Sequence, residues 1–119
     1  MKKLIAVYGT LKEGHHNHRV LGESKLIGKH VTEPKFTMYS NGGFPIVSPY
    51  GDTPIVIEVY QVDNPTDLQR VYRLEGYSGT RNSSANWYDT VDVETPYGVA
   101  EMFVMDKVQG RPVVASGEW

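Results

Sequence analysis

Short apolar runs alternate with polar, glycine-containing segments along most of the chain. The first run, residues 4–8, ends at Gly9, which is typical of a buried strand followed by a tight turn. The polar segment after it is rich in His, Asn and Gly. Within that segment residues 17–21 predict a short helix, with Asn17 as its cap.

Most of the remaining patterns favour strands. Residues 24–40 mix β-branched and polar side chains and predict extended structure, and residues 55–62 form the run densest in β-branched residues. Residues 87–94 alternate between apolar and polar. The turn sequence at 95–98 predicts that residues 99–105 pair back on them as a hairpin.

One segment, residues 65–76, carries the period and the end signals of a helix. Asn64 can cap its start, and Pro65 occupies the first helical position, where a missing N–H costs nothing. Gly76 can adopt the left-handed conformation that ends a helix. The order strand, strands, helix, hairpin predicts an α+β fold: a small, mostly antiparallel β-barrel with flanking helices.

Length and composition narrow the class of protein. The 119 residues fit one domain, residues 1–119. No cysteine is present, which excludes disulfides, thiol catalysis and cysteine-based zinc sites. The net charge of -2 without a basic run argues against nucleic acid as a partner. No apolar run approaches the roughly 20 residues of a membrane span, and the first run is too short for a signal peptide. We therefore expect a cytoplasmic protein without a membrane partner.

A glutamate interrupts the apolar stripe of the predicted helix. Leu68, Val71 and Tyr72 form the stripe, and residue 75 continues their spacing at its centre. Because burying an unpartnered carboxylate costs several kcal/mol, Glu75 must lie at a frayed end, be hydrogen-bonded in the core, or line a cavity. In an apolar-walled pocket its pKa would rise, as an acid–base catalyst near neutral pH requires.

The turn Tyr8-Gly9-Thr10-Leu11 after the first strand is the second candidate feature. Gly9 lets the backbone approach a ligand, and successive N–H groups could bind an anion. By itself a glycine after a strand is usually only a turn. The spacing from Gly9 to Gly14 does not match a dinucleotide-binding fingerprint.

Together these features point to a known family. The segment Val7 to Gly14 resembles the signature opening of the gamma-glutamylcyclotransferase-like superfamily, and residues 17–21 resemble its gamma-glutamylamine cyclotransferase branch. Further matches follow in the family's order, at Phe44-Pro45-Ile46-Val47, Glu58-Val59-Tyr60-Gln61-Val62, Leu74-Glu75-Gly76-Tyr77, Tyr88 and Ser116-Gly117-Glu118-Trp119. The resemblance spans essentially the whole chain.

The resemblance implies an enzyme that cleaves a C–N bond by cyclisation. Glu75 would be the general base and acid. Tyr8, Gly9, Thr10 and Leu11 would bind the gamma-glutamyl group, with Tyr88 as a further pocket residue. The substrate's α-amine would attack its own γ-carbonyl and release 5-oxoproline, without a cofactor. The chain departs from many members at Thr90, where they carry Arg, and this bears mainly on the leaving group.

Three other interpretations remain open. The same fold could be a non-catalytic small-molecule binding module, which would not need Glu75 in an apolar stripe. The same chemistry could remove a protecting gamma-glutamyl group from a biosynthetic intermediate. A metal site at His15, His16 and His18 beside Glu13 is disfavoured, because spacings of one and two residues in a loop define no chelating face. No metal is therefore predicted, and the oligomeric state stays unknown.

Aromatic residues divide between core and pocket. Trp87, Phe103 and Tyr60 are predicted to be core, and Phe44-Pro45 is predicted to form a rigid apolar pocket wall. The polar insertion over residues 78–86 is predicted to form a mobile rim.

Overall fold

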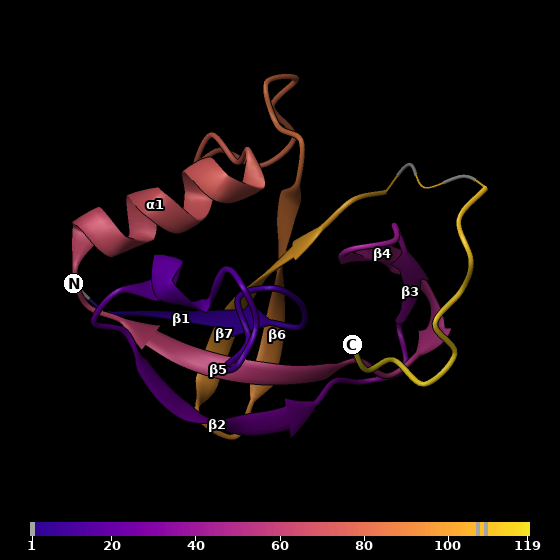
Figure 1. Ribbon diagram of the computed structural model, residues 1–119, viewed down its shortest axis with the longest axis horizontal. Coiled ribbons are helices and arrows are strands. Elements are labelled where there is room, and N and C mark those ends of the chain that lie inside the picture. The colour runs from indigo at the N-terminus through magenta and orange to yellow at the C-terminus, as the bar shows by residue number, and fades with distance from the viewer. Residues whose placement is uncertain (1, 107, 109) are drawn as a thin grey trace.

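The computed structural model describes residues 2–106, 108 and 110–119. Figure 1 shows the elements in chain order: β1 (Lys3–Val7), the 3-10 helix η1 (His18–Leu21), β2 (Lys25–Val31), β3 (Phe36–Ser40), β4 (Pro45–Thr53), β5 (Val56–Val62), α1 (Pro65–Glu75), β6 (Asp89–Thr95) and β7 (Gly98–Val104). Each predicted strand is present, with bounds shifted by one or two residues at most ends. Among the described residues, no helix has the length and apolar character needed to cross a membrane.

The strands form two sheets. Five of them lie in the order β2-β5-β1-β7-β6, and β3 pairs with β4 in a separate two-stranded sheet. Every pairing is antiparallel except that of β1 with β7, which is parallel. The predicted α+β fold with a mostly antiparallel sheet is therefore confirmed.

The five-stranded sheet does not close into a barrel. In the part of the chain that the structure describes, no ladder joins the two edge strands β2 and β6. The hydroxyl of Tyr97, in the turn between β6 and β7, instead donates a hydrogen bond of 3.2 Å to the carbonyl oxygen of Lys29 in β2. Gly28 makes room for this contact, because a Cβ there would lie 2.2 Å from the Tyr97 oxygen. A side chain thus bridges the two edges where the expected barrel would need paired backbones.

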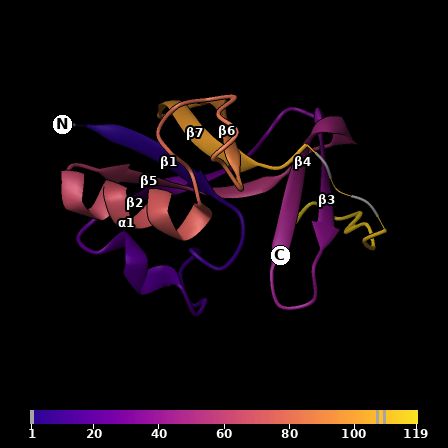
Figure 2. The same ribbon diagram turned by 90° about the horizontal axis from the view of Figure 1, so that it is seen from above.

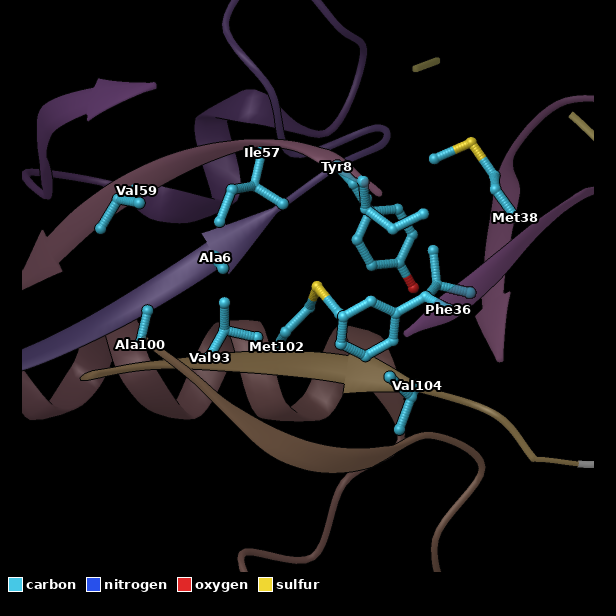
Figure 3. Packing of buried hydrophobic residues seen from close by; sticks show 12 residues of the cluster. Ala6, Tyr8, Phe36, Met38, Ile57, Val59, Val93, Ala100, Met102 and Val104 are labelled. Carbon is cyan, nitrogen blue, oxygen red and sulfur yellow. The ribbon is translucent and has the colours of Figure 1, made fainter. Parts of the chain in front are cut away.

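Side chains of each central strand alternate between two apolar clusters, as the pleat of a strand requires. On β1, Ile5 and Val7 face α1, whereas Ala6 faces the β3–β4 sheet. The cluster on the β3–β4 side is drawn in Figure 3, and it joins residues of both sheets: Ala6, Tyr8, Phe36, Met38, Val47, Ile55, Ile57, Val59, Val93, Ala100, Met102 and Val104. The five-stranded sheet is therefore covered on both faces.

Helix α1 has the ends that the sequence predicts. The side-chain oxygen of Asn64 accepts a hydrogen bond of 2.8 Å from the Thr66 amide, and Pro65 begins the helix. Gly76 ends it in the left-handed conformation, with φ 64° and ψ 35°. The helix lies along one face of the five-stranded sheet (Figure 2), with Val71 fully buried beneath it. This placement brings Glu75, the last helical residue, to one end of the sheet.

The first turn of α1 is tied to the segment after η1 through Asp67. This carboxylate is buried and accepts hydrogen bonds from the Glu23 amide at 3.1 Å and from Arg70 at 3.4 Å. A Cβ on Gly22 would lie 2.3 Å from an Asp67 oxygen. The start of the helix is thus fixed by contacts of its own, at the end opposite Glu75.

Two further expectations are wrong. Asn17 precedes η1 but its side chain forms no cap hydrogen bond, and its Nδ2 donates to the Thr10 hydroxyl. Trp87 is 79% exposed, because β6 begins only at Asp89 and the indole packs over Gly76 outside the sheet. Phe103 and Tyr60 are buried, as predicted.

Candidate active site

A pocket of about 250 Å³ lies where the ends of β1 and α1 meet the start of β4. Its volume falls just below the range of roughly 300–1,000 Å³ that is usual for pockets enclosing drug-sized ligands. Its walls are mainly apolar, and they are formed by Ala6, Val7, Tyr8, Gly9, Thr10, Leu11, His16, Asn17, Phe44, Pro45, Leu74, Glu75, Tyr88 and Phe103. The structure thus brings the predicted glutamate, the predicted turn and Tyr88 together around one small cavity.

The turn after β1 lines this pocket. Within the described residues, the amides of Gly9, Thr10 and Leu11 donate to no other backbone or side-chain group. Gly9 itself is buried against Pro45. Adjacent N–H groups without internal partners can bind a carboxylate or a developing oxyanion.

Asn17 and His18 brace this turn from the following loop. The Asn17 side chain donates to the Thr10 hydroxyl at 2.9 Å, and its backbone amide donates to the Thr10 carbonyl at 2.9 Å. The His18 ring nitrogen Nδ1 lies 3.0 Å from the Leu11 carbonyl oxygen. With their carbonyl groups bonded to this brace, Thr10 and Leu11 keep a fixed backbone orientation at the pocket.

Glu75 is partly buried and is the acidic residue in the pocket lining. Removal of its carboxylate from water raises the pKa of Glu75 from 4.5 to about 7. Burial is the cause, as expected for a carboxyl group between apolar walls. Near neutral pH this group can therefore both accept and donate a proton.

Two tyrosines face the same pocket. Burial raises the pKa of Tyr8 well above its usual value, with smaller effects from Tyr88 and Glu75. Burial also raises the pKa of Tyr88, and the Glu75 charge adds to the rise. Both phenols therefore stay protonated at neutral pH, and the Tyr8 hydroxyl donates to the Phe103 carbonyl at 2.7 Å.

The chain returns to Glu75 after leaving the helix. The Trp87 amide donates to the Gly76 carbonyl at 2.9 Å, and the Tyr88 amide donates to the Glu75 carbonyl at 3.2 Å. Tyr88 is thus held beside Glu75 by backbone as well as by packing. At the departure from the family pattern, the Thr90 hydroxyl accepts a hydrogen bond of 2.9 Å from Nε of Arg81.

Several pocket residues escaped sequence reasoning. Leu74 precedes the predicted glutamate, and Phe103 is predicted only as a core residue; the fold makes both of them line the pocket. His16 was considered only as a metal ligand, yet it lines the pocket. The sequence pattern predicts Asn17 as a helix cap, whereas the structure places it in the pocket lining. The family resemblance of residues 17–21 was the signal that could have indicated a place at the site. Phe44 and Pro45 do line the pocket, as predicted.

No cluster of three or more His, Cys, Asp or Glu side chains suited to a metal ion occurs among the described residues. The His18 ring is engaged with Leu11, as described above, and His16 is exposed at the pocket. The loop histidines therefore have separate local surroundings.

Comparison with protein families matches residues 5–119 to a model described as "Gamma-glutamyl cyclotransferase, AIG2-like". The chain belongs to this family. The match covers nearly all of the sequence, including the turn, the helix-end glutamate and Tyr88. The superfamily suggested by the sequence motifs is confirmed, and the chain is a gamma-glutamylcyclotransferase-like enzyme.

Individual relatives agree with the family. A Vibrio cholerae protein whose name provisionally assigns it as a gamma-glutamylcyclotransferase is 32% identical over 120 residues, covering 100% of this chain and 96% of that protein. The gamma-L-glutamyl-butirosin B gamma-glutamyl cyclotransferase of Niallia circulans is 28% identical over 76% of this chain and 56% of its own length. An uncharacterised Pyrococcus horikoshii protein of known structure is 26% identical, with a TM-score of 0.78 over 98% of this chain and 88% of that one.

Proposed function

We propose that this member of the family releases 5-oxoproline and a free amine or amino acid from a gamma-glutamyl substrate, with Glu75 as general base and then general acid. The observation that carries the proposal is the position of Glu75. A carboxyl group whose pKa is raised to about 7 lines the same pocket as a turn whose amides have no hydrogen-bond partner among the described residues. A base and an oxyanion-binding group on one small cavity are what an intramolecular acyl transfer requires.

In the first step the Glu75 carboxylate takes a proton from the substrate's α-ammonium group. The freed α-nitrogen attacks the γ-carbonyl carbon of the same molecule, and a C–N bond closes a five-membered ring. The carbonyl oxygen becomes an oxyanion, for which the amides of the Gly9 to Leu11 turn are the available donors. The small pocket favours the folded glutamyl conformation, and such positioning can supply much of the reduction in barrier.

In the second step the oxyanion returns to a carbonyl as the bond to the leaving nitrogen breaks. Protonated Glu75 gives its proton to that nitrogen. The α-nitrogen loses a second proton as it becomes the lactam nitrogen, and the departed amine takes up one as it becomes ammonium. Protons therefore balance overall, with no redox change. Neither a covalent intermediate nor a cofactor enters the sequence.

The substrate is a small gamma-glutamyl compound, and its leaving group is an amine or an amino acid. The Niallia circulans relative is named for a gamma-glutamyl-butirosin substrate. This name supports testing compounds in which the gamma-glutamyl group is attached to an amine-bearing intermediate. The panel of candidate substrates also contains gamma-glutamyl amines, gamma-glutamyl amino acids and glutathione. All of them would share the glutamyl-binding turn.

The proposal is tested by mass spectrometric detection of 5-oxoproline after incubation with this panel. We expect product from the wild type with at least one class of substrate. Glu75→Gln should lower kcat by about 10²- to 10⁴-fold, because it keeps the shape of the side chain but cannot accept the proton. Glu23→Gln is the matched control, because Glu23 is exposed and its side chain lies outside the pocket.

Two results would contradict the proposal. Wild-type turnover in Glu75→Gln would remove Glu75 from the mechanism. Binding of gamma-glutamyl compounds without 5-oxoproline from any of them would favour the non-catalytic binding module instead.

A further inference from the structure

The segment between α1 and β6 leaves the helix at Gly76 and returns to it at Trp87. We call residues 77–86 the return loop. Two backbone hydrogen bonds close its base, from Trp87 to Gly76 and from Tyr88 to Glu75. The base of the return loop is therefore bonded to the backbone of Glu75, which lines the pocket.

The Arg81 side chain of the return loop contacts two strands of the five-stranded sheet. Its Nε donates to the hydroxyl of Thr90 at 2.9 Å, and its Nη2 lies 2.6 Å from an Asp92 carboxylate oxygen. The same Nη2 lies 4.0 Å from Glu101 on β7. One guanidinium group therefore joins the return loop to two strands. Its planar arrangement of N–H groups lets arginine bind several acceptors at once.

The charged groups around Arg81 come from every neighbouring element. Asp92 lies on β6 and Glu101 on β7, and Glu101 also binds Lys3 of β1 at 3.0 Å and accepts from the hydroxyl of Tyr72 of α1. Tyr77, within the return loop, faces it as well. These acids and the hydrogen bond to Asp92 raise the pKa of Arg81 further, so its charge is constant over any usable pH range.

A chain of contacts runs from Arg81 to the pocket wall. The Thr90 hydroxyl, which accepts from Arg81, donates to the Tyr77 hydroxyl at 3.2 Å, and both groups are buried. The Tyr77 ring meets the Phe103 ring edge-on, with centroids 6.0 Å apart. Phe103 lines the pocket, and its carbonyl accepts from Tyr8.

Other contacts of the return loop keep its own shape. Asn86 accepts from the Ser78 amide at 2.7 Å and donates to the Thr80 carbonyl at 2.9 Å, which ties the loop to itself. The Asn82 amide donates to Asp89 at 2.8 Å, at the very start of β6. Arg81 differs because it connects the loop to a buried hydroxyl further along the strand.

We propose that Arg81 is a positioning residue for the cyclisation: it fixes the return loop on β6 and so keeps Tyr88 beside Glu75 in the pocket. This inference rests on the proposed function. Without Arg81 the return loop should move away from the sheet and carry Tyr88 with it. Water would then reach the Glu75 carboxylate, which would become a weaker base.

The role can be separated from global stability because the ion pair itself is exposed. The side chains of Arg81 and Asp92 are 41% and 63% exposed, and exposed pairs contribute little to the stability of a fold. Arg81→Ala should therefore unfold at nearly the wild-type temperature. Its kcat should fall by about tenfold or more, since small displacements of reacting groups carry penalties of that size. KM should change less, because the 8–11 turn lines the pocket and Arg81 does not.

The pH dependence supplies a readout that a purely structural role would not move. The groups that face Glu75 are Tyr8 from the end of β1, His16 from the following loop, and Tyr88. Both tyrosines stay neutral, and His16 is unchanged by the substitution. If water reaches Glu75 in Arg81→Ala, its pKa falls, and the acid limb of the kcat/KM profile moves to lower pH. The position of this limb therefore reports the solvation of Glu75.

Arg81→Lys and Arg70→Ala are the matched variants. Lysine keeps the charge near Asp92 but lacks the fork that also reaches Thr90, so it should restore only part of the activity. Arg70 forms a comparable pair with Asp67 at the other end of α1, so Arg70→Ala should leave kcat and the acid limb at wild-type values. If Arg81→Ala does not fold, Thr90→Val interrupts the same chain while leaving the Arg81–Asp92 pair intact, and it should shift both readouts in the same direction.

A measurement without substrate separates this inference from the proposed function. The pKa of Glu75 can be followed by carbon NMR of its carboxyl group in the wild type and in Arg81→Ala. A lower pKa in Arg81→Ala supports the positioning role even if the wild type forms no 5-oxoproline. An unchanged pKa, or wild-type kcat with an unchanged acid limb, overturns it.

Discussion

Gly9 lies against the ring of Pro45 so closely that a Cβ on Gly9 would stand 2.6 Å from Cγ and 2.8 Å from Cδ of the proline. Gly9 comes from the end of β1, and Pro45 begins β4 of the other sheet. The contact thus sets how closely the turn after β1 and the pocket wall at Pro45 can approach each other. A side chain on Gly9 would have to push the two sheets apart at this end.

Gly9→Ala should weaken catalysis more than it weakens the fold. Pro45 is rigid and cannot rotate away from the new methyl group, so the turn must shift. We expect kcat/KM to fall by about tenfold or more, and the free energy of unfolding to fall by about 1–3 kcal/mol. Steady-state kinetics and urea unfolding measure the two effects.

Gly43→Ala is the control for that substitution. Gly43 lies in the loop just before Pro45, and a Cβ there has no atom within 4 Å. Its kinetics should match the wild type. Equal losses in both alanine variants would mean that the loop, and not the Gly9–Pro45 contact, controls the turn.

The pH dependence of kcat/KM should reveal the raised pKa of Glu75. The base must be ionised in the free enzyme, and its pKa is about 7. Activity should therefore fall by a factor of ten for each pH unit below about 7. A profile that stays flat down to the ordinary glutamate range, near pH 4.3, would show a fully solvated carboxylate or a different base.

Glu75→Gln should also stabilise the protein, in a pH-dependent manner. Because the pKa is higher in the folded state than in the unfolded state, the folded state holds the proton more tightly, and the wild type loses stability as pH rises from 4.5 to about 7. A shift of this size corresponds to about 3 kcal/mol. Neutral glutamine avoids the cost of a buried charge.

Thermal unfolding of both proteins across this pH range measures the effect. Glu75→Gln should unfold at a higher temperature than the wild type at pH 8, and the difference should vanish near pH 4. Equal stability of the two proteins at pH 8 would contradict burial of the Glu75 charge.

Local signals were reliable where the chemistry is local. Asn64, Pro65 and Gly76 mark the ends of α1 because capping and left-handed glycine depend on neighbouring backbone groups alone. The same spacing placed Glu75 among apolar residues. The turn from Tyr8 to Leu11 followed from an apolar run ending in glycine, together with its family motif.

Expectations failed where distant segments compete for the same group. Asn17 has a good capping side chain, yet it caps no helix and instead donates through Nδ2 to the Thr10 hydroxyl of the turn. Trp87 fits the alternating pattern of the strand, but it lies against Gly76 before β6 begins at Asp89. Its indole is therefore exposed. The expected barrel closure would need paired edge strands. The bond from Tyr97 to Lys29 spans the edges instead.

The sequence by itself determined the strands other than β4, the helix with its ends, and the presence of a glutamate on an apolar face. It did so because side-chain period, capping and turn chemistry act over a few residues. Only the tertiary structure decided that this glutamate faces a pocket and not solvent, and that Tyr88, Phe44 and Asn17 meet around it. Those contacts join residues far apart in the chain. Their geometry depends on how the sheets and the helix pack, and no local pattern carries it.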